Sequence, residues 1–166
     1  MLGVVSVLQA VLIFGIAASL VFLATPIILS SVQESMDVSE SSSVKQQLEF
    51  CNNKILETAR TGTQNTCVFS TQSTLKGKVY LKQDGIYYEL LSDAKVCDQT
   101  DWVNINPDKY IWLKCDLQDS KRFYQLRWSP PTEIIFILGD RQIGNNLEIN
   151  RINVTANNTN LYLNFR

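Results

Sequence analysis

The sequence predicts an α+β protein, in which a long N-terminal hydrophobic α-helix is followed by an antiparallel, β-sandwich-like globular domain. Residues 1–33 carry no charge, so the 15 basic and 16 acidic residues all lie at or after Glu34. Apolar residues continue at helical spacing to residue 59, and beyond Gly62 the pattern changes to the period of two that is typical of strands. We therefore expect an N-terminal helix over residues 1–60 and a β-rich globular domain over residues 61–166.

The uncharged run, residues 1–33, is long enough to cross a bilayer. At about 1.5 Å per helical residue it would extend roughly 50 Å, which exceeds the hydrocarbon thickness of a membrane. Pro26 lacks a backbone N–H, so we expect a kink or local melting of the helix there. The segment is therefore predicted to lie in a membrane or in another apolar environment.

An amphipathic helix is predicted over residues 34–60. Its apolar face consists of residues spaced by three or four positions, namely Val44, Leu48, Cys51, Ile55 and Ala59. The serine-rich segment 39–43 leaves two alternatives, because serine favours turns and caps. One is a single helix of about 55–60 residues with a frayed centre, and the other is two helices with a serine as the second N-cap. Arg60 and Gly62 are suited to the last turn and the C-terminal cap.

The β-rich domain is predicted from alternating segments separated by turn residues. Asp84-Gly85 is the strongest hairpin signal, and Ser129-Pro130-Pro131 is expected to interrupt the sheet. The segments that we expect to be strands, mostly joined as hairpins, are 68–70, 78–82, 86–91, 110–117, 123–128, 133–138, 147–155 and 160–165. This order favours a β-sandwich or a curled sheet.

Four separated cysteines favour two disulfides. None lies in a C-x-x-C pair and the chain has no histidine, so a structural zinc site is not expected. Four cysteines allow three connectivities. We expect nearest-neighbour pairing, Cys51 with Cys67 and Cys97 with Cys115. The first bond would join the end of the helix to the first strand, and the second would close a loop rich in aromatic residues. The alternative is four buried free thiols in a cytosolic domain.

The residue types favour a protein that is not an enzyme and needs no cofactor or metal. Without histidine, Ser–His and Cys–His nucleophile pairs are impossible, and no glycine-rich phosphate loop is present. Asp98 and Asp101 could share a calcium ion, but a solvated loop is the preferred interpretation. The alternating aromatic residues are interpreted as sheet core, with carbohydrate stacking as the second interpretation. The net charge of −1 offers no basic footprint for nucleic acid.

Two Asn-x-Thr sequons begin at Asn153 and Asn157 and predict glycosylation on an extracellular surface. The first charged residues after the apolar run, Glu34, Asp37 and Glu40, are acidic, which is also typical of an exterior flank. No basic residue precedes Lys45, so we expect that a short basic leader has been removed and that Met1 follows the cut. The alternative is a native initiator methionine on an uncharged signal anchor.

The whole layout resembles that of type IV pilin-type subunits, and it is most similar to the archaeal branch of adhesion pilins and archaeal flagellins. The residues that carry this resemblance are the uncharged apolar run 1–33, the amphipathic continuation and the single small β domain. Bacterial pilins usually have a glutamate at the fifth mature position, where this chain has Val5. That difference favours the archaeal branch.

The resemblance implies a function as a structural subunit of an extracellular filament for adhesion or surface attachment. It implies leader cleavage by a prepilin peptidase, storage in the membrane, and extraction by a pilus assembly machinery into a helical homopolymer. The β domains would then lie outside a core of bundled helices. The alternative is a single-span membrane-anchored surface protein whose extracytoplasmic β domain binds a partner.

Several residues of the apolar run would then pack in the filament core. Small residues let helices approach closely. Gln9 is the only amide in the stretch 2–19, and we expect it to bond a neighbouring copy or a main-chain carbonyl. The residues assigned to core packing are Gly3, Gln9, Ala10, Gly15, Ala17, Ala18, Ser19 and Pro26.

Overall fold

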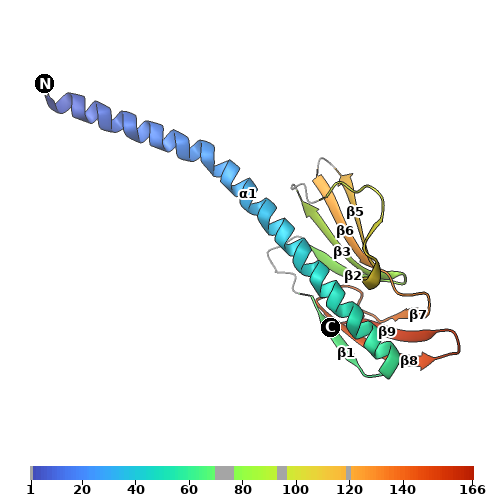
Figure 1. The fold of residues 1–166 in the computed structure, drawn as a ribbon. Helices are drawn as coiled ribbons and strands as arrows, with labels where there is room; N and C mark the ends of the chain where they lie inside the picture. Colours follow the sequence, from blue (N-terminus) through green and yellow to red (C-terminus); the bar gives the residue numbers. More distant parts are fainter. Residues whose placement is uncertain (1, 70–76, 93–96, 119–120) are drawn as a thin grey trace. The chain divides into compact units, whose positions relative to one another are not determined.

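The computed structural model describes residues 2–69, 77–92, 97–118 and 121–166, without the side chains of residues 2–8, 10 and 118. The chain divides into two compact units, Met1–Met36 and Asp37–Arg166. One helix, α1 (Leu2–Thr61), contributes to both units (Figure 1). Its residues from Asp37 onward therefore belong with the strands, and the boundary lies inside the helix rather than at its end.

Helix α1 is continuous, so the single-helix alternative holds over the serine-rich segment. Ser41 Oγ donates to the Val38 carbonyl at 2.9 Å, which satisfies the hydroxyl within the helix. The helix ends at Thr61, and Gly62 follows with a φ of 79° while its N–H donates to the Thr58 carbonyl at 2.9 Å. This left-handed C-terminal cap is the one that Gly62 predicts.

The strands form two sheets that share one core. The four-stranded sheet has the order β1-β8-β9-β7 and the five-stranded sheet the order β2-β3-β6-β5-β4. The strands are β1 (Asn65–Val68), β2 (Lys78–Lys82), β3 (Gly85–Ser92), β4 (Val103–Asn106), β5 (Ile111–Gln118), β6 (Lys121–Trp128), β7 (Ile134–Leu138), β8 (Asn146–Val154) and β9 (Thr159–Phe165), with a short 3₁₀-helix η1 (Pro107–Lys109) between β4 and β5. The predicted fold class, α+β with a β-sheet domain, is confirmed.

The expectation of antiparallel strands in hairpin order is wrong in two respects. Strand β7 pairs with β9 in parallel, with Ile134 opposite Thr159, and β1 pairs with the distant β8. Strand β4 lies in a segment for which no strand was predicted. The predicted first strand, 68–70, begins three residues earlier, and Ser70 lies outside the described residues.

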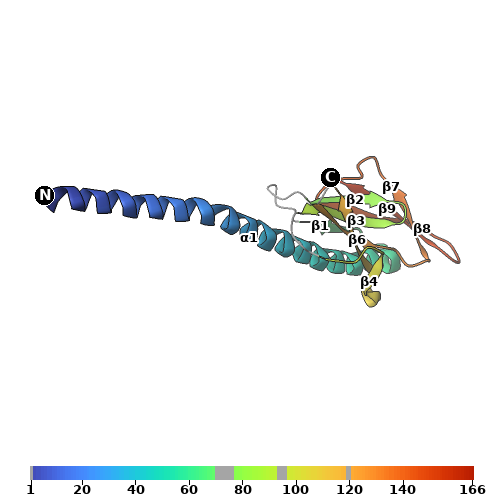
Figure 2. The same ribbon diagram turned by 90° about the horizontal axis from the view of Figure 1, so that it is seen from above.

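Within the second unit, the helix face predicted from the spacing is buried. Val44, Leu48, Cys51 and Ile55 are all completely inaccessible, and they join the inner faces of both sheets in one cluster. In both views the part of α1 that follows Asp37, cyan to green, runs beside the strands (Figures 1 and 2). The largest fully buried side chains include Trp128 and Tyr88, from β6 and β3. The amphipathic helix is therefore the third component of the domain core, together with the two sheets.

Candidate functional site: the apolar helix segment and its anchor

The first unit consists of an apolar helix whose side chains are exposed in the isolated chain. Phe14 and Phe22 expose 78% and 82% of their surface, and every described side chain from Val11 to Val32 is exposed. An 18-residue window of this helix has a mean hydropathy of 2.5. By length and composition the helix is able to cross a membrane.

The hydroxyl groups between Val11 and Val32 are satisfied by the helix itself. Ser19 Oγ donates to the Gly15 carbonyl at 2.8 Å, and Thr25 Oγ1 donates to the Val21 carbonyl at 2.6 Å. Ser30 and Ser31 both donate to the Ile27 carbonyl, at 2.9 and 3.0 Å. Since each hydroxyl already has an acceptor, none needs water, and the segment tolerates an apolar surrounding.

The small residues assigned to core packing form an open surface. A β-carbon placed on Gly15 would meet no atom within 4 Å, and Ala17, Ala18 and Ser19 are exposed. The Gln9 side chain is also exposed, so its predicted bond to a neighbouring copy stays a prediction. Pro26 lies inside the continuous helix. Gly3 and Ala10 lie in the helix, at positions whose exposure the structure does not describe.

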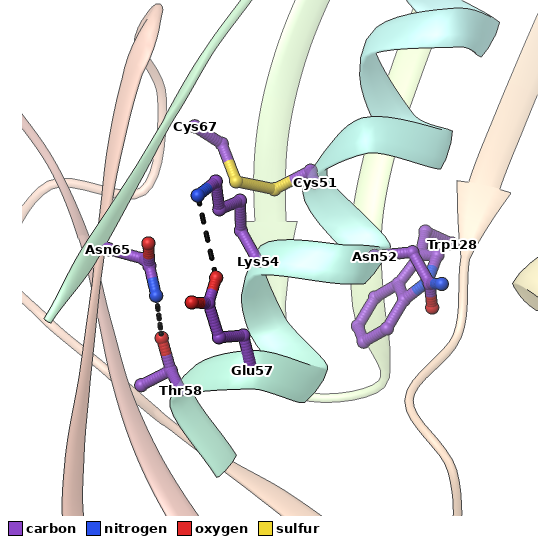
Figure 3. The surroundings of a disulfide bond; sticks show 8 residues. All are labelled: Cys51, Asn52, Lys54, Glu57, Thr58, Asn65, Cys67 and Trp128. Carbon is purple, nitrogen blue, oxygen red and sulfur yellow. Dashed lines mark hydrogen bonds and ion pairs between the residues drawn. A yellow bond between two sulfur atoms is a disulfide. The ribbon is translucent and has the colours of Figure 1, made fainter. Parts of the chain in front are cut away.

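The amphipathic part of α1 is joined covalently to the four-stranded sheet. Cys51 of α1 and Cys67 of β1 form a disulfide with a Cα–Cα distance of 5.4 Å (Figure 3). Cys97 and Cys115 form the second disulfide, at 6.1 Å, and link β5 to the segment before β4. These are the two predicted pairs, and no cysteine is free. Two disulfides indicate an oxidising, extracytoplasmic environment.

Polar contacts hold the same helix segment to the five-stranded sheet. Asn52 is 1% exposed, and its Oδ1 accepts from the Trp128 indole Nε1 at 3.0 Å (Figure 3). Asn106 Nδ2 donates to Glu49 Oε1 at 2.9 Å, and Lys109 Nζ donates to Asn53 Oδ1 at the same distance. The helix is thus bound to both sheets.

Arg151 of β8 binds the C-terminal end of α1. Its guanidinium donates to the carbonyls of Ala59 at 3.1 Å, Arg60 at 3.0 Å and Thr61 at 3.5 Å. A cation there satisfies terminal carbonyls and complements the negative end of the helix dipole. Sequence reasoning assigned this role to Arg60 alone. Arg151 was missed because it is about 90 residues away and no local pattern connects the two segments.

Two of the acidic residues that were interpreted as an exterior flank are buried. Asp37 is 1% exposed and accepts a hydrogen bond from the Ser92 hydroxyl, while Glu40 is 4% exposed. Burial raises the pKa of the Glu40 carboxyl above its ordinary value of 4.5. The Tyr88 hydroxyl opposes this change, and the charge of Asp37 adds to it. Both carboxyls therefore contribute to the packing of the domain rather than to a solvated flank.

The two sequon asparagines lie on the exposed surface at the β8–β9 connection. Asn153 is near the end of β8, where its Oδ1 accepts from Asn160 Nδ2. Asn157 lies in the following turn, which is closed by hydrogen bonds between Thr155 and Asn158. Both side chains are exposed, so both acceptors are sterically accessible for modification.

One of the two acidic residues of the loop considered for calcium forms an ion pair. Asp98 accepts from Arg122 at 2.7 Å, and Asp101 is exposed. Within the described ranges, no three His, Cys, Asp or Glu side chains are grouped so that they could hold a metal.

Comparison of this chain with models of protein families, with curated proteins and with solved structures found no match.

Proposed function

We propose that this protein is the structural subunit of an extracellular helical filament of the type IV pilus kind, with adhesion or surface attachment as its role. The observation that carries the proposal is the exposed apolar surface from Val11 to Val32, continuous in one helix with a segment bonded to both sheets. The apolar helix indicates membrane insertion and the disulfides indicate an extracytoplasmic domain. A filament subunit needs both the apolar helix and the extracytoplasmic domain, because it is stored in the membrane and then assembled outside the cell.

The physical reason is the cost of exposing this surface to water. At about 25 cal/mol per Å² of apolar surface, hiding some 20 large side chains is worth tens of kcal/mol before entropy costs. Outside a membrane, copies of the same helix provide the only environment of matching length and polarity that the chain itself supplies. Identical subunits joined head to tail by a rotation that does not close produce an open helical filament.

The anchoring contacts support the same proposal. A filament under tension transmits force from the core helix to the outer domain. The Cys51–Cys67 disulfide lies on that route, and so do Asn52–Trp128 and the Arg151 contacts. A covalent bond between helix and sheet prevents the helix from being pulled out of the domain.

The second candidate is a single-span surface protein whose β domain binds a partner. It is favoured by the same apolar segment, which is long enough to cross a bilayer once. In this case the helix stays in lipid and its small residues have no packing role.

Shearing of intact cells followed by sedimentation without detergent distinguishes the two. The filament proposal expects the chain in the sheared, sedimenting fraction, with filaments visible by electron microscopy. A protein found only in the membrane fraction, and released only by detergent, would reject the filament and leave the anchor.

A further inference from the structure

A groove in the second unit is lined by side chains to which the proposed function assigns no role. Its volume is about 610 Å³, which lies within the range of small-ligand sites. The walls come from the last turns of α1, from the start of β5 and from the Ser129–Glu133 segment before β7. The side chains that matter most are Tyr110, Trp112, Arg60 and Glu133.

The apolar wall includes two aromatic rings and two prolines. Tyr110 is 37% exposed and Trp112 is half-buried, and both line the groove together with Pro130 and Pro131. The guanidinium of Arg127 lies 5.7 Å from the centroid of the Trp112 ring and thereby supports it. The Trp112 ring, supported in this way, provides a preformed contact surface.

Among the non-glycine residues that the structure describes, Tyr110 alone has a positive φ, at 57°. Its carbonyl accepts from Ser129 N–H at 3.0 Å and its own N–H donates to the Pro107 carbonyl at 3.2 Å. This conformation caps the C-terminal end of η1, and a tyrosine in the left-handed region costs free energy. The two hydrogen bonds hold the Tyr110 backbone in place beside the groove that its side chain lines.

The rim provides charged side chains that have no ion-pair partner in the part of the chain that the structure describes. Arg60 and Glu133 are exposed and form no ion pair with any other described residue, and Thr132 is exposed beside them. Guanidinium, carboxylate and hydroxyl groups together can donate to and accept from neighbouring hydroxyls of a ligand. An aromatic surface with such a rim fits a ligand that has apolar C–H faces and many hydroxyl groups.

The groove also adjoins the turn that carries a sequon. A second cavity of about 450 Å³ shares Glu133 and Thr159 with the groove and is lined by Asn157. A saccharide attached to Asn157 would therefore start next to the groove. We propose that the groove is a saccharide-binding site, with Tyr110 and Trp112 as the stacking rings and Arg60 and Glu133 as the polar contacts.

Two sources of the same chemistry are possible: the glycan of the chain's own Asn157 turn, and a saccharide on another surface. In the first case the groove orders a covalently attached sugar, and in the second it serves attachment. The inference does not rest on filament assembly, so a negative result here leaves the filament proposal intact, and the reverse also holds.

The test uses the full chain made in a host without N-glycosylation, in a detergent whose headgroup is not a sugar. The probes are D-mannose, D-galactose, N-acetyl-D-glucosamine and their disaccharides, and binding is measured by saturation-transfer NMR. We expect Tyr110→Gly to weaken binding by at least about tenfold, which corresponds to about 1.4 kcal/mol for a lost stacking contact. Glycine suits the left-handed backbone, so this variant removes the ring without adding strain.

Trp112→Ala should weaken binding to a similar extent, and Phe50→Ala is the matched control. Phe50 is 57% exposed on α1 and does not line the groove, so its loss should leave binding unchanged. The inference is overturned if none of the probes binds, or if Tyr110→Gly binds as strongly as the parent chain.

The same NMR binding measurement, made on glycosylated protein, distinguishes the two sources of the saccharide. If the chain's own glycan occupies the groove, the glycosylated protein will not bind added sugar and Asn157→Gln will restore binding. If both forms bind equally, the site takes an external saccharide. Binding by both forms that is insensitive to Tyr110→Gly would place the sugar elsewhere and reject the site.

Discussion

Individual polar residues fasten both ends of the α1 segment, residues 37–61, that belongs to the β domain. Asp37 and Glu40 are buried where this segment begins, and Arg151 binds the carbonyls where it ends. The sequence predicts the cap at the C-terminal end of the helix, because Gly62 and Arg60 form a local capping pattern, but it does not predict the contacts at the beginning of the segment. Burial of Glu40 and the reach of Arg151 depend on strands that are distant in sequence, so neither could be inferred from local patterns.

Glu40 should make the domain more stable in acid. Because its pKa is raised in the folded state, its stabilising contribution is fully present below 4.5, the ordinary value, and is lost as the pH rises through the raised pKa. We expect Glu40→Gln to reduce the fall in melting temperature between acidic and neutral pH. Thermal unfolding of the variant and the parent chain, from acidic to neutral pH, measures this change in melting temperature.

Glu57→Gln is the control for that measurement, since Glu57 is exposed on the same helix and pairs with Lys54. Its pH profile should follow that of the parent chain. Identical profiles for Glu40→Gln and the parent would show that the carboxyl does not titrate as its burial requires.

Removal of the Arg151 guanidinium should destabilise the domain. Arg151→Ala leaves the carbonyls of Ala59, Arg60 and Thr61 without their side-chain donor, at an expected cost of about 1–2 kcal/mol. Arg151→Lys should restore part of this, since it keeps the charge but not the forked donors. Urea denaturation of the three proteins provides the comparison, and a change below about 0.5 kcal/mol in Arg151→Ala would contradict the capping role.

At the scale of elements, periodicity predicts the long helix and most strands, but not how the strands pair. The segment Lys78–Lys82 matches β2, and the turn at residues 83–84 joins it to β3, which begins at Gly85, because hairpins are encoded by adjacent residues. Strand β4 has only four residues before Pro107, too few for a clear alternation. The parallel pairing of β7 with β9 bypasses β8 in sequence, and no local signal specifies such a crossover.

Each disulfide should stabilise the domain by a similar amount. The two bonds close loops with sequence separations of 16 and 18 residues, for which chain entropy predicts about 3 kcal/mol each. Replacing both cysteines of one pair by alanine and measuring urea denaturation tests this. A loss well below about 1 kcal/mol for either pair would reject the entropic account for that loop.

The apolar helix should tolerate extra bulk in lipid but not in a bundle. Ala18→Phe adds volume at the level of Gly15, Ala17 and Ser19, and overfilling a packed core costs about 1–3 kcal/mol per copy. We expect normal expression and membrane insertion with few or no sheared filaments. Ile143→Phe is the control, because Ile143 is 67% exposed in the second unit and lies outside the apolar segment. Unchanged filaments in Ala18→Phe would contradict close packing at this level.

For the whole molecule, the central question is what covers the apolar segment. The composition of residues 1–33 predicts an apolar surrounding, and the exposed side chains from Val11 to Val32 agree with this. Neither the composition nor a single copy of the chain distinguishes lipid from neighbouring helices. That distinction depends on contacts between copies, and the residues of one copy do not specify the symmetry of an assembly.

Helical reconstruction of the sheared material by cryo-electron microscopy tests the filament proposal most directly. We expect a central bundle of helices built from residues 11–32 of successive copies, with the β domains around it and no lipid inside. A filament whose axis is formed by β domains, or an apolar helix found only in membrane fragments, would contradict the proposal.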